Sequence, residues 1–262
     1  MAEKYFTVDG VATFVHHRGP TTLPGSPPAP SGGATVLCLH DAAGNGHVFT
    51  GLLDALSGEA GPIAFDLPGH GRSGGLDSLG RIEAMAAHAH GLVDRLGVTS
   101  AVLVGDGMGA AVAVELAATW PALPTAVVLC GWSAVAPDQA ALDQLRQVTS
   151  GRARRQFDTT GYAPDTPREV YQRAFGEWMK TDPRATVGDL EALAAWNEAE
   201  RIGSITAPVT IVVGEHEGAE ARAAAERLAA ALSDARVVEL AGAGRRGVVE
   251  QPVALAEIVV AA

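Results

Sequence analysis

Several ionisable residues of this chain stand at or just after the ends of apolar runs, where buried strands would end. Asp41 follows the run TVLCLH, Asp106 follows SAVLVG, and Glu217 lies just beyond VTIVVG. Carboxyl groups in such places can take up and return protons, which is the chemistry of general acid–base catalysis. His40 adds a further proton carrier and Arg245 a permanent positive charge. We therefore predict a site in which these five side chains handle protons and negative charge.

The stretch LVGDGMGAAV, residues 103–112, has the form of a sharp turn between a strand and a helix. In the motif G-x-S-x-G the flanking glycines let strand and helix pack closely, and the middle serine is a nucleophile in a strained backbone conformation. Gly105 and Gly109 take the flanking positions here, but the middle position is Gly107. Because glycine has no side chain, this turn cannot supply a nucleophile.

Alternating apolar runs and helical patterns predict the elements that position these residues. The order is typical of a mostly parallel sheet with helices on both faces, preceded by a hairpin that turns at Asp9 and Gly10. We expect strands at residues 5–8, 11–16, 35–40, 62–65, 100–104, 125–130, 209–213 and 235–240. Helices are expected at 48–56, 81–96, 108–119, 219–232 and from about 252 onward. Residues 18–33, rich in proline and glycine, are expected to form a surface loop.

Residues 133–205 interrupt the alternation of strands and helices. The segment is more charged, is rich in helix formers and has prolines at 164, 167 and 183 that mark breaks. We predict an inserted helical cap over a core made of residues 1–132 and 206–262. Tyr162 and Trp178 in this segment, together with Trp132, suit the walls of an apolar pocket. Packing of the cap rings among the cap helices is the alternative.

Composition narrows the classes of partner. The formal net charge of −11 argues against nucleic acid and anionic membranes, since binding to phosphates depends on lysine and arginine. Cys38 and Cys130 lie in apolar runs, which indicates buried thiols and no disulfide. The beginning MAEKYFTVDG has no apolar signal segment, and no run reaches the roughly 18 apolar residues of a membrane span. We expect a cytoplasmic protein with a small-molecule ligand, and a homodimer remains open.

No cofactor or metal is expected from the sequence motifs. The elbow GDGMGA lacks the spacing G-x-G-x-x-G and the lysine of a phosphate-binding loop. The histidines do not follow a metal-ligand pattern.

Five segments resemble motifs of the α/β-hydrolase family, in that family's order and over nearly the whole chain. They are LCLHDAAGNGH at 37–47, FDLPGHGRS at 65–73, the elbow at 102–110, VTIVVGEHE at 209–217 and LAGAGRRGVVEQP at 240–252. The resemblance implies an α/β-hydrolase fold of class α/β. Its sheet would have eight mostly parallel strands with helices on both faces and an inserted helical cap.

The positions that match the family's catalytic triad depart from it. The nucleophile, acid and histidine correspond to Gly107, Glu217 and Arg245, so only the acid is kept. Arginine stays protonated near neutral pH and cannot accept the proton that a histidine would take. We expect Arg245 to pair with Glu217, either as a structural clasp or, helped by Arg246, as an anchor for an anionic substrate. Asp41 stands where the family commonly has a glycine beside the oxyanion hole.

Three functions remain open. The favoured one is a cofactor-independent, non-hydrolytic enzyme, namely a lyase, isomerase, decarboxylase or cyclase acting on a small apolar carbonyl compound. The backbone N–H groups of Ala42 and Met108 would bind the carbonyl oxygen, while His40 or one of the carboxylates moves protons. The second is a catalytically silent protein that binds a small molecule or a partner. The third is a hydrolase that uses water activated by a carboxylate.

Overall fold

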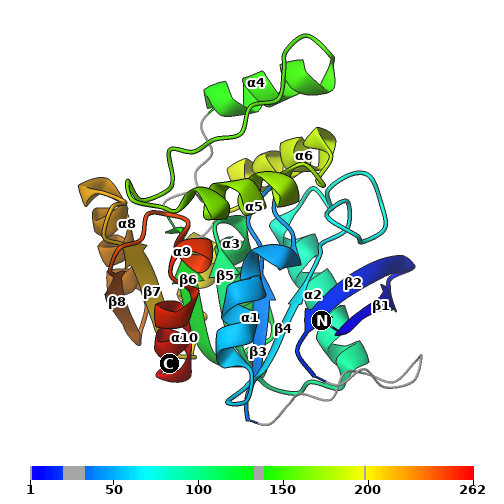
Figure 1. The fold of residues 1–262 in the computed structure, drawn as a ribbon. Coiled ribbons are helices and arrows are strands. Elements are labelled where there is room, and N and C mark those ends of the chain that lie inside the picture. The colour runs from blue at the N-terminus through cyan, green and yellow to red at the C-terminus, as the bar shows by residue number, and fades with distance from the viewer. Residues whose placement is uncertain (1, 20–32, 133–138, 198) are drawn as a thin grey trace.

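A mixed sheet of eight strands forms the centre of the molecule (Figure 1). The computed structural model describes residues 2–19, 33–132, 139–197 and 199–262. The sheet has the order β1-β2-β4-β3-β5-β6-β7-β8, in which β1 pairs with β2 and β2 with β4 antiparallel, and the other neighbours pair in parallel. The strands are β1 (Ala2–Val8), β2 (Val11–His17), β3 (Thr35–Leu39), β4 (Gly61–Phe65), β5 (Ala101–Asp106), β6 (Pro124–Cys130), β7 (Val209–Gly214) and β8 (Ala235–Leu240). The predicted eight-stranded, mostly parallel sheet is confirmed.

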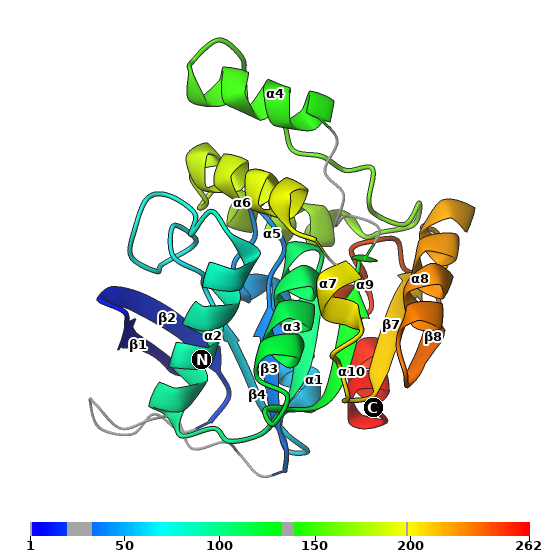
Figure 2. The same cartoon turned by 180° about the vertical axis from the view of Figure 1, so that it is seen from behind.

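Helices cover both faces of the sheet (Figures 1 and 2). One face carries the 3-10 turn η1 (Gly46–Phe49) with α1 (Thr50–Leu56), α9 (Gly247–Glu250) and α10 (Pro252–Val260), and the other α2 (Ile82–Leu96), α3 (Met108–Thr119) and α8 (Ala219–Ala231). Successive strand residues point to opposite faces, so Leu103 joins the apolar core under α2 and α3, while Val104 joins the core under α1 and α10. The central strands are therefore predominantly apolar on both faces, as in other parallel sheets buried on both sides.

The predicted strands and helices agree with the structure apart from a few ends. β5 runs to Asp106, two residues beyond the predicted end at Val104, and Asp106 lies opposite Cys130 of β6. The sequence pattern did not separate η1 from α1 and did not predict α9. Most of the predicted loop at 18–33, and the start of the predicted cap at 133–138, lie outside the described residues. The extension of β5 matters because it makes Asp106 a strand residue with a buried side chain.

Helices from the middle of the chain lie above the carboxyl ends of the parallel strands (Figure 1). They are α4 (Gln139–Thr149), which is farthest from the sheet, α5 (Arg168–Trp178) and α6 (Pro183–Ala195), whereas the short α7 (Ala199–Ile202) packs beside α3. A buried contact between His70 Nε2, in the loop after β4, and Asp189 Oδ2 on α6 measures 2.7 Å. This contact fixes α6 to the core, and the burial of both side chains makes it sensitive to the charge of either partner.

Three further observations concern membrane spans, metal sites and cysteines in the part of the chain that the structure describes. Within it, no helix is long and apolar enough to cross a membrane. The same residues contain no group of three or more His, Cys, Asp or Glu side chains arranged to hold a metal ion. Cys38 and Cys130 are buried free thiols.

Candidate functional site

The Asp41 carboxylate lies at the carboxyl edge of the sheet, just after β3 and beside the turn from β5 to α3. Its Oδ1 accepts hydrogen bonds from the backbone N–H groups of Ala42, at 2.8 Å, and Met108, at 2.9 Å. These are the two N–H groups that the sequence analysis assigned to a carbonyl oxygen of a substrate. In this structure they bind the protein's own carboxylate, so the oxyanion position is occupied by Asp41.

Gly107 forms the apex of the turn and faces the same carboxylate. Its φ of 54° and ψ of −115° are the strained backbone conformation expected at this position. A Cβ atom built at Gly107 would collide with Asp41 Oδ1 and Cγ. Gly105 and Gly109 pack so closely against neighbouring backbone that side chains there would also collide, as the motif predicts. Asp41 thus fills both the oxyanion position and the space that a nucleophile at 107 would need.

Two arginines neutralise the Asp41 carboxylate. Arg246 Nη1 lies 2.7 Å from Asp41 Oδ2, and Arg245 Nη1 lies 3.6 Å from the same atom. Burial raises the pKa of Asp41, but the two arginines and the two N–H donors outweigh it, and the pKa stays below its ordinary value. Asp41 is therefore an anion that accepts three hydrogen bonds and has a second arginine close by, which makes it a poor base.

Arg245 forms an ion pair with Asp41 that the sequence analysis did not predict. Glu217 lies in the turn after β7, where its Oε1 accepts a hydrogen bond of 3.1 Å from the N–H of Gly214. Arg246, which the sequence analysis named only as a helper of Arg245, makes the shorter contact with Asp41. Two adjacent arginines cannot be ranked from sequence, because the loop geometry decides which one turns toward the carboxylate.

Asp106 is the second carboxyl group of the site. Its side chain is buried, and an added Cβ at Gly131 would lie 3.3 Å from its Oδ1. Burial and the neighbouring Asp41 carboxylate raise the pKa of Asp106 to about 7, against the opposing effect of the two arginines, while Glu217 adds to the increase. A carboxyl group with this pKa exchanges its proton near neutral pH, as a general acid–base requires.

His40, the predicted proton carrier, contacts backbone groups through both ring nitrogens. Its Nε2 accepts a hydrogen bond of 3.1 Å from the N–H of Leu67, so the proton resides on Nδ1, which donates to the carbonyl of Asp41 at 2.9 Å. Burial, together with the charge of His70, lowers the pKa of His40 to about 4. Both ring nitrogens are engaged with the backbone and the ring is neutral, so in this structure no free ring nitrogen of His40 faces the site, and its predicted role stays a prediction.

The three aromatic residues predicted to line a pocket lie in different places. Tyr162 is half-buried next to the charged cluster. Burial raises its pKa; the charge of Arg246 lowers it in part, and that of Asp106 adds to the increase. Trp178 instead packs among rings and cations of the cap, with Phe157 at 5.5 Å and the guanidinium carbon of Arg155 at 3.8 Å from its ring centroid. Trp132 is 8% exposed and belongs to the core cluster, which leaves little of it to contact a ligand.

Glu250, which the sequence analysis did not single out, links the segment around Ala163, part of the predicted cap, to the loop of the site. Its Oε1 accepts from the N–H of Ala163 at 2.6 Å, and its Oε2 accepts from the N–H of Gly244 at 2.9 Å. Beside it, the N–H of Arg246 donates to the carbonyl of Gly161 at 3.1 Å. The cap segment that carries Tyr162 is therefore bound to the loop that carries both arginines. No sequence signal marks this role, because it depends on a contact between distant segments.

Comparison with known proteins places these features in a family context. A model of the Alpha/beta hydrolase family matches residues 36–258. The chain is 28% identical to the magnesium-chelatase 30 kDa subunit of Rhodobacter capsulatus over 72% of its own length and 73% of that protein. It is 32% identical to lipase LipV of Mycobacterium tuberculosis, over 62% of this chain and 58% of the lipase. For a 2-hydroxy-6-oxononadienedioate/2-hydroxy-6-oxononatrienedioate hydrolase of Pseudomonas sp the identity is 27%, over 59% of this chain and 60% of the hydrolase.

Solved structures of esterases and lactonases share the fold. An esterase from Exiguobacterium antarcticum superposes with a TM-score of 0.83 at 18% identity, covering 100% of this chain and 98% of the esterase. The enol-lactonase from Burkholderia xenovorans LB400 gives a TM-score of 0.76 at 20% identity, covering 98% of each chain. At such low identity these similarities concern the fold alone.

Proposed function

The chain belongs to the alpha/beta hydrolase family, and on this premise we propose that it acts on a small carbonyl compound by proton transfer, without an acyl-enzyme. The observation that carries the proposal is the position of the Asp41 carboxylate. The covalent route of the family needs a nucleophilic side chain at the turn and free N–H donors for the oxyanion. Residue 107 has no side chain, and Asp41 already binds both donors. Catalysis in this site would therefore proceed through acid–base chemistry.

Asp106 is the proposed general acid–base. With a pKa of about 7 it is present in both protonation states near neutral pH. When Asp106 is protonated, two guanidinium groups face one carboxylate, that of Asp41, and the cluster carries one net positive charge. This charge attracts an anionic substrate or an enolate oxygen. Arg245 makes the longer contact with Asp41 and is the better placed of the two arginines to donate to such an oxygen.

The proposed step moves one proton and consumes nothing. Asp106, as the carboxylate, takes a proton from the carbon next to the substrate carbonyl, and the electrons of that bond pass to the oxygen as an enolate. When Asp106 returns the proton to another carbon of a conjugated enolate, the isomerisation is complete; return to the same carbon regenerates the substrate and leaves only hydrogen exchange. A lyase, decarboxylase or cyclase would use the same enolate. The helical segment at 133–205 is proposed to act as the cap that excludes water from this site.

Deuterium exchange at the carbon next to the carbonyl tests the proposal directly. The protein is incubated in deuterium oxide with a panel of small ketones, aldehydes and 2-oxo acids, and exchange is followed by proton NMR. We expect exchange with at least one compound, and we expect Asp106→Asn to reduce its rate by 100-fold or more, as is typical for the loss of a general base. Glu226→Gln, an exposed change on α8, is the matched control and should leave the rate unchanged. Equal rates in wild type and Asp106→Asn, or stoichiometric labelling by a fluorophosphonate, would contradict the proposal.

Hydrolysis by activated water is the second candidate, and the names of the relatives favour it. In this chain Asp106 would take the proton from water, because Asp41 is held as a weakly basic anion. Hydrolysis of simple esters and enol lactones, lost in Asp106→Asn and insensitive to fluorophosphonate, would select this reaction over enolisation.

Binding without turnover is the third candidate, favoured by the occupied oxyanion position. It predicts that compounds of the same panel raise the melting temperature while neither exchange nor hydrolysis occurs.

A further inference from the structure

The contact between His70 and Asp189 joins the loop after β4 to helix α6. His70 Nε2 lies 2.7 Å from Asp189 Oδ2, and both side chains are 0% exposed. On the other side of the ring, Nδ1 lies 3.0 Å from the carbonyl oxygen of Pro68. A carbonyl oxygen only accepts hydrogen bonds, so Nδ1 carries a hydrogen, and a second hydrogen must lie between Nε2 and Asp189. The closed contact therefore holds one proton more than a neutral imidazole beside a carboxylate.

Asp189 has no second partner that could hold its charge in place of His70. Its Oδ1 is buried without a hydrogen-bond partner among the described residues, as is Thr186 Oγ1, one turn earlier on α6. If the shared proton leaves, the neutral ring has a single N–H for two acceptors, and one contact becomes a lone pair facing a lone pair. A buried carboxylate beside a neutral ring is strongly disfavoured. Asp189 then gains by moving into water, which requires α6 to lift from the core.

The other ionisable groups around His70 leave this proton in control. Burial lowers the pKa of His70, but Asp189 outweighs it, Asp66 adds to the increase, and the net pKa is raised. His40, whose ring centroid lies 5.0 Å from that of His70, has a pKa of about 4 and stays neutral. A groove of about 550 Å³ beside His70 is lined on its far side by charged side chains of types that keep their charge between pH 6 and 9, namely Arg155, Lys180 and Asp182.

We propose that the pair of His70 and Asp189 is a pH-sensitive latch, which holds α6 on the core while the shared proton is bound and releases it when that proton is lost. A Cβ at Gly188 would lie 2.8 Å from Ser78 Cβ, so this part of α6 rests directly on the core. Ala192 and Leu193, near the end of α6, belong to the apolar core cluster and hold that end. Release therefore tilts the beginning of α6 outward and widens the groove. The inference rests on the proposed function only in treating α6 as part of the cap.

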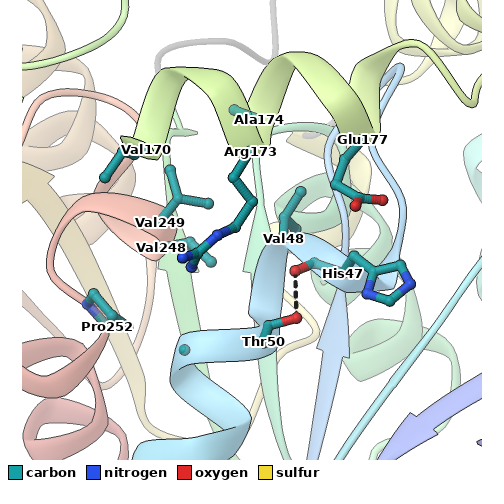
Figure 3. Close-up of a pocket in the computed structure, with 11 residues that line it drawn as sticks. His47, Val48, Thr50, Val170, Arg173, Ala174, Glu177, Val248, Val249 and Pro252 are labelled. Carbon is teal, nitrogen blue, oxygen red and sulfur yellow. Dashed lines mark hydrogen bonds between the residues drawn. The ribbon is translucent and has the colours of Figure 1, made fainter. Parts of the chain in front are cut away.

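The neighbouring helix α5 is held by contacts of a different kind. Val170 on α5 lies beside Val249 of α9 in an apolar contact (Figure 3). His47 lines the same contact, and burial and the neighbouring His16 lower its pKa, so it titrates at lower pH than His70. An apolar contact thus holds one helix of this segment and an ionic contact holds the other, so α5 serves as an internal reference for α6.

Hydrogen–deuterium exchange followed by mass spectrometry tests the latch without any substrate. The protein is labelled at pH 6 and pH 9, for times scaled to the intrinsic exchange rate at each pH. We expect the ratio of the protection factor of α6 to that of α5 to fall at least tenfold from pH 6 to pH 9. In Asp189→Asn the ratio should not depend on pH, because an amide can donate to a neutral ring. Glu191→Gln, an exposed change on α6, is the matched control and should keep the wild-type fall.

Titration of the histidines by NMR gives a second reading that does not depend on how well Asp189→Asn folds. The Cε1–H signal of His70 in wild type should titrate above the ordinary value of about 6.5, in the same pH range in which α6 loses protection. The latch would be overturned by an equal ratio at both pH values in wild type, by a wild-type fall in Asp189→Asn, or by titration of His70 below 6.5. Asp106→Asn should keep the wild-type fall, so failure of the proton-transfer proposal and failure of the latch are separate results.

Discussion

The carboxylate of Asp41 lies where a side chain at Gly107 would have to be, so the two residues form one structural unit. The carboxylate can accept from the N–H of Met108 only because position 107 has no Cβ. In turn, the bare turn leaves no void, because Asp41 fills the space. The missing side chain at Gly107 and the carboxylate of Asp41 therefore depend on each other. A substitution at either residue is expected to disturb the other.

Gly107→Ser should destabilise the protein without creating esterase activity. The new side chain would collide with the Asp41 carboxylate, and a residue with a Cβ is strained at a φ of 54°. Overpacking of this kind costs about 1–3 kcal/mol, and backbone strain adds to it. Urea denaturation measures the loss, and p-nitrophenyl acetate tests activity. Gly203→Ser is the control, because nothing lies within 4 Å of a Cβ at Gly203.

The double variant Asp41→Gly with Gly107→Ser should lose less stability than the sum of the two single changes. Removal of the carboxylate leaves room for the serine, so the two effects are coupled. Additive losses in the double-mutant cycle would show that the two positions do not compete for the same space.

Asp41→Ala should convert the internal carboxylate site into a site for external carboxylates. The substitution leaves two N–H groups and two arginines without their common partner, at an expected cost of about 3–5 kcal/mol. Acetate is small enough to replace the lost group, so 100 mM sodium acetate should raise the melting temperature of Asp41→Ala more than that of wild type. Sodium chloride at the same ionic strength controls for screening, and an equal effect of both salts would exclude specific rescue.

Asp106→Asn should change how stability depends on pH. The pKa of Asp106 is raised to about 7 in the folded protein, whereas in the unfolded chain it is close to 4, so between these values the folded state holds a proton that the unfolded state has released. The free energy of unfolding of wild type therefore falls as pH rises through this window and levels off above it. In Asp106→Asn this fall is absent, so urea denaturation from pH 4 to 8 should show a growing advantage of the variant. Parallel curves would contradict the raised pKa.

The contact between His70 and Asp189 should also make stability depend on pH. Here the group with the raised pKa is a histidine, which is charged when protonated. Burial lowers the pKa of His70, but Asp189 outweighs it and the net pKa is raised. A raised histidine pKa contributes fully below the unfolded value of about 6.5, and its contribution is lost as pH rises through the folded pKa. Asp189→Asn should thus cost more stability at pH 6 than at pH 9. A cost independent of pH would mean that His70 does not gain a proton from this partner.

Sequence patterns predicted the framework well because apolar runs and glycine spacings are local properties. The sheet, the helix at 108–119 and the close approach of Gly105 and Gly109 were all confirmed. The sequence also indicated that Asp41, Asp106 and Arg245 would gather at one sheet edge, since the carboxyl ends of parallel strands meet there.

The finer contacts of the site could not be predicted, because they depend on the directions of side chains in loops. His40 was expected to carry protons, yet its two nitrogens bind backbone groups that lie far apart in the sequence. The position of the Asp41 carboxylate is set by two backbone N–H groups and two arginines. These groups come from segments far apart in the sequence, so no local residue pattern predicts that they contact Asp41. Glu250 acts through the cap segment, whose path over the core the sequence leaves undetermined.

The shared space of Asp41 and Gly107 also limits which substitutions this turn accepts. A serine at position 107 alone introduces a collision, and loss of the acid alone leaves two half-buried cations without their common partner, so either single change lowers stability. A side chain can return to the apex at low cost only when the carboxylate at position 41 is removed with it. The two positions therefore behave as one interchangeable module of the elbow.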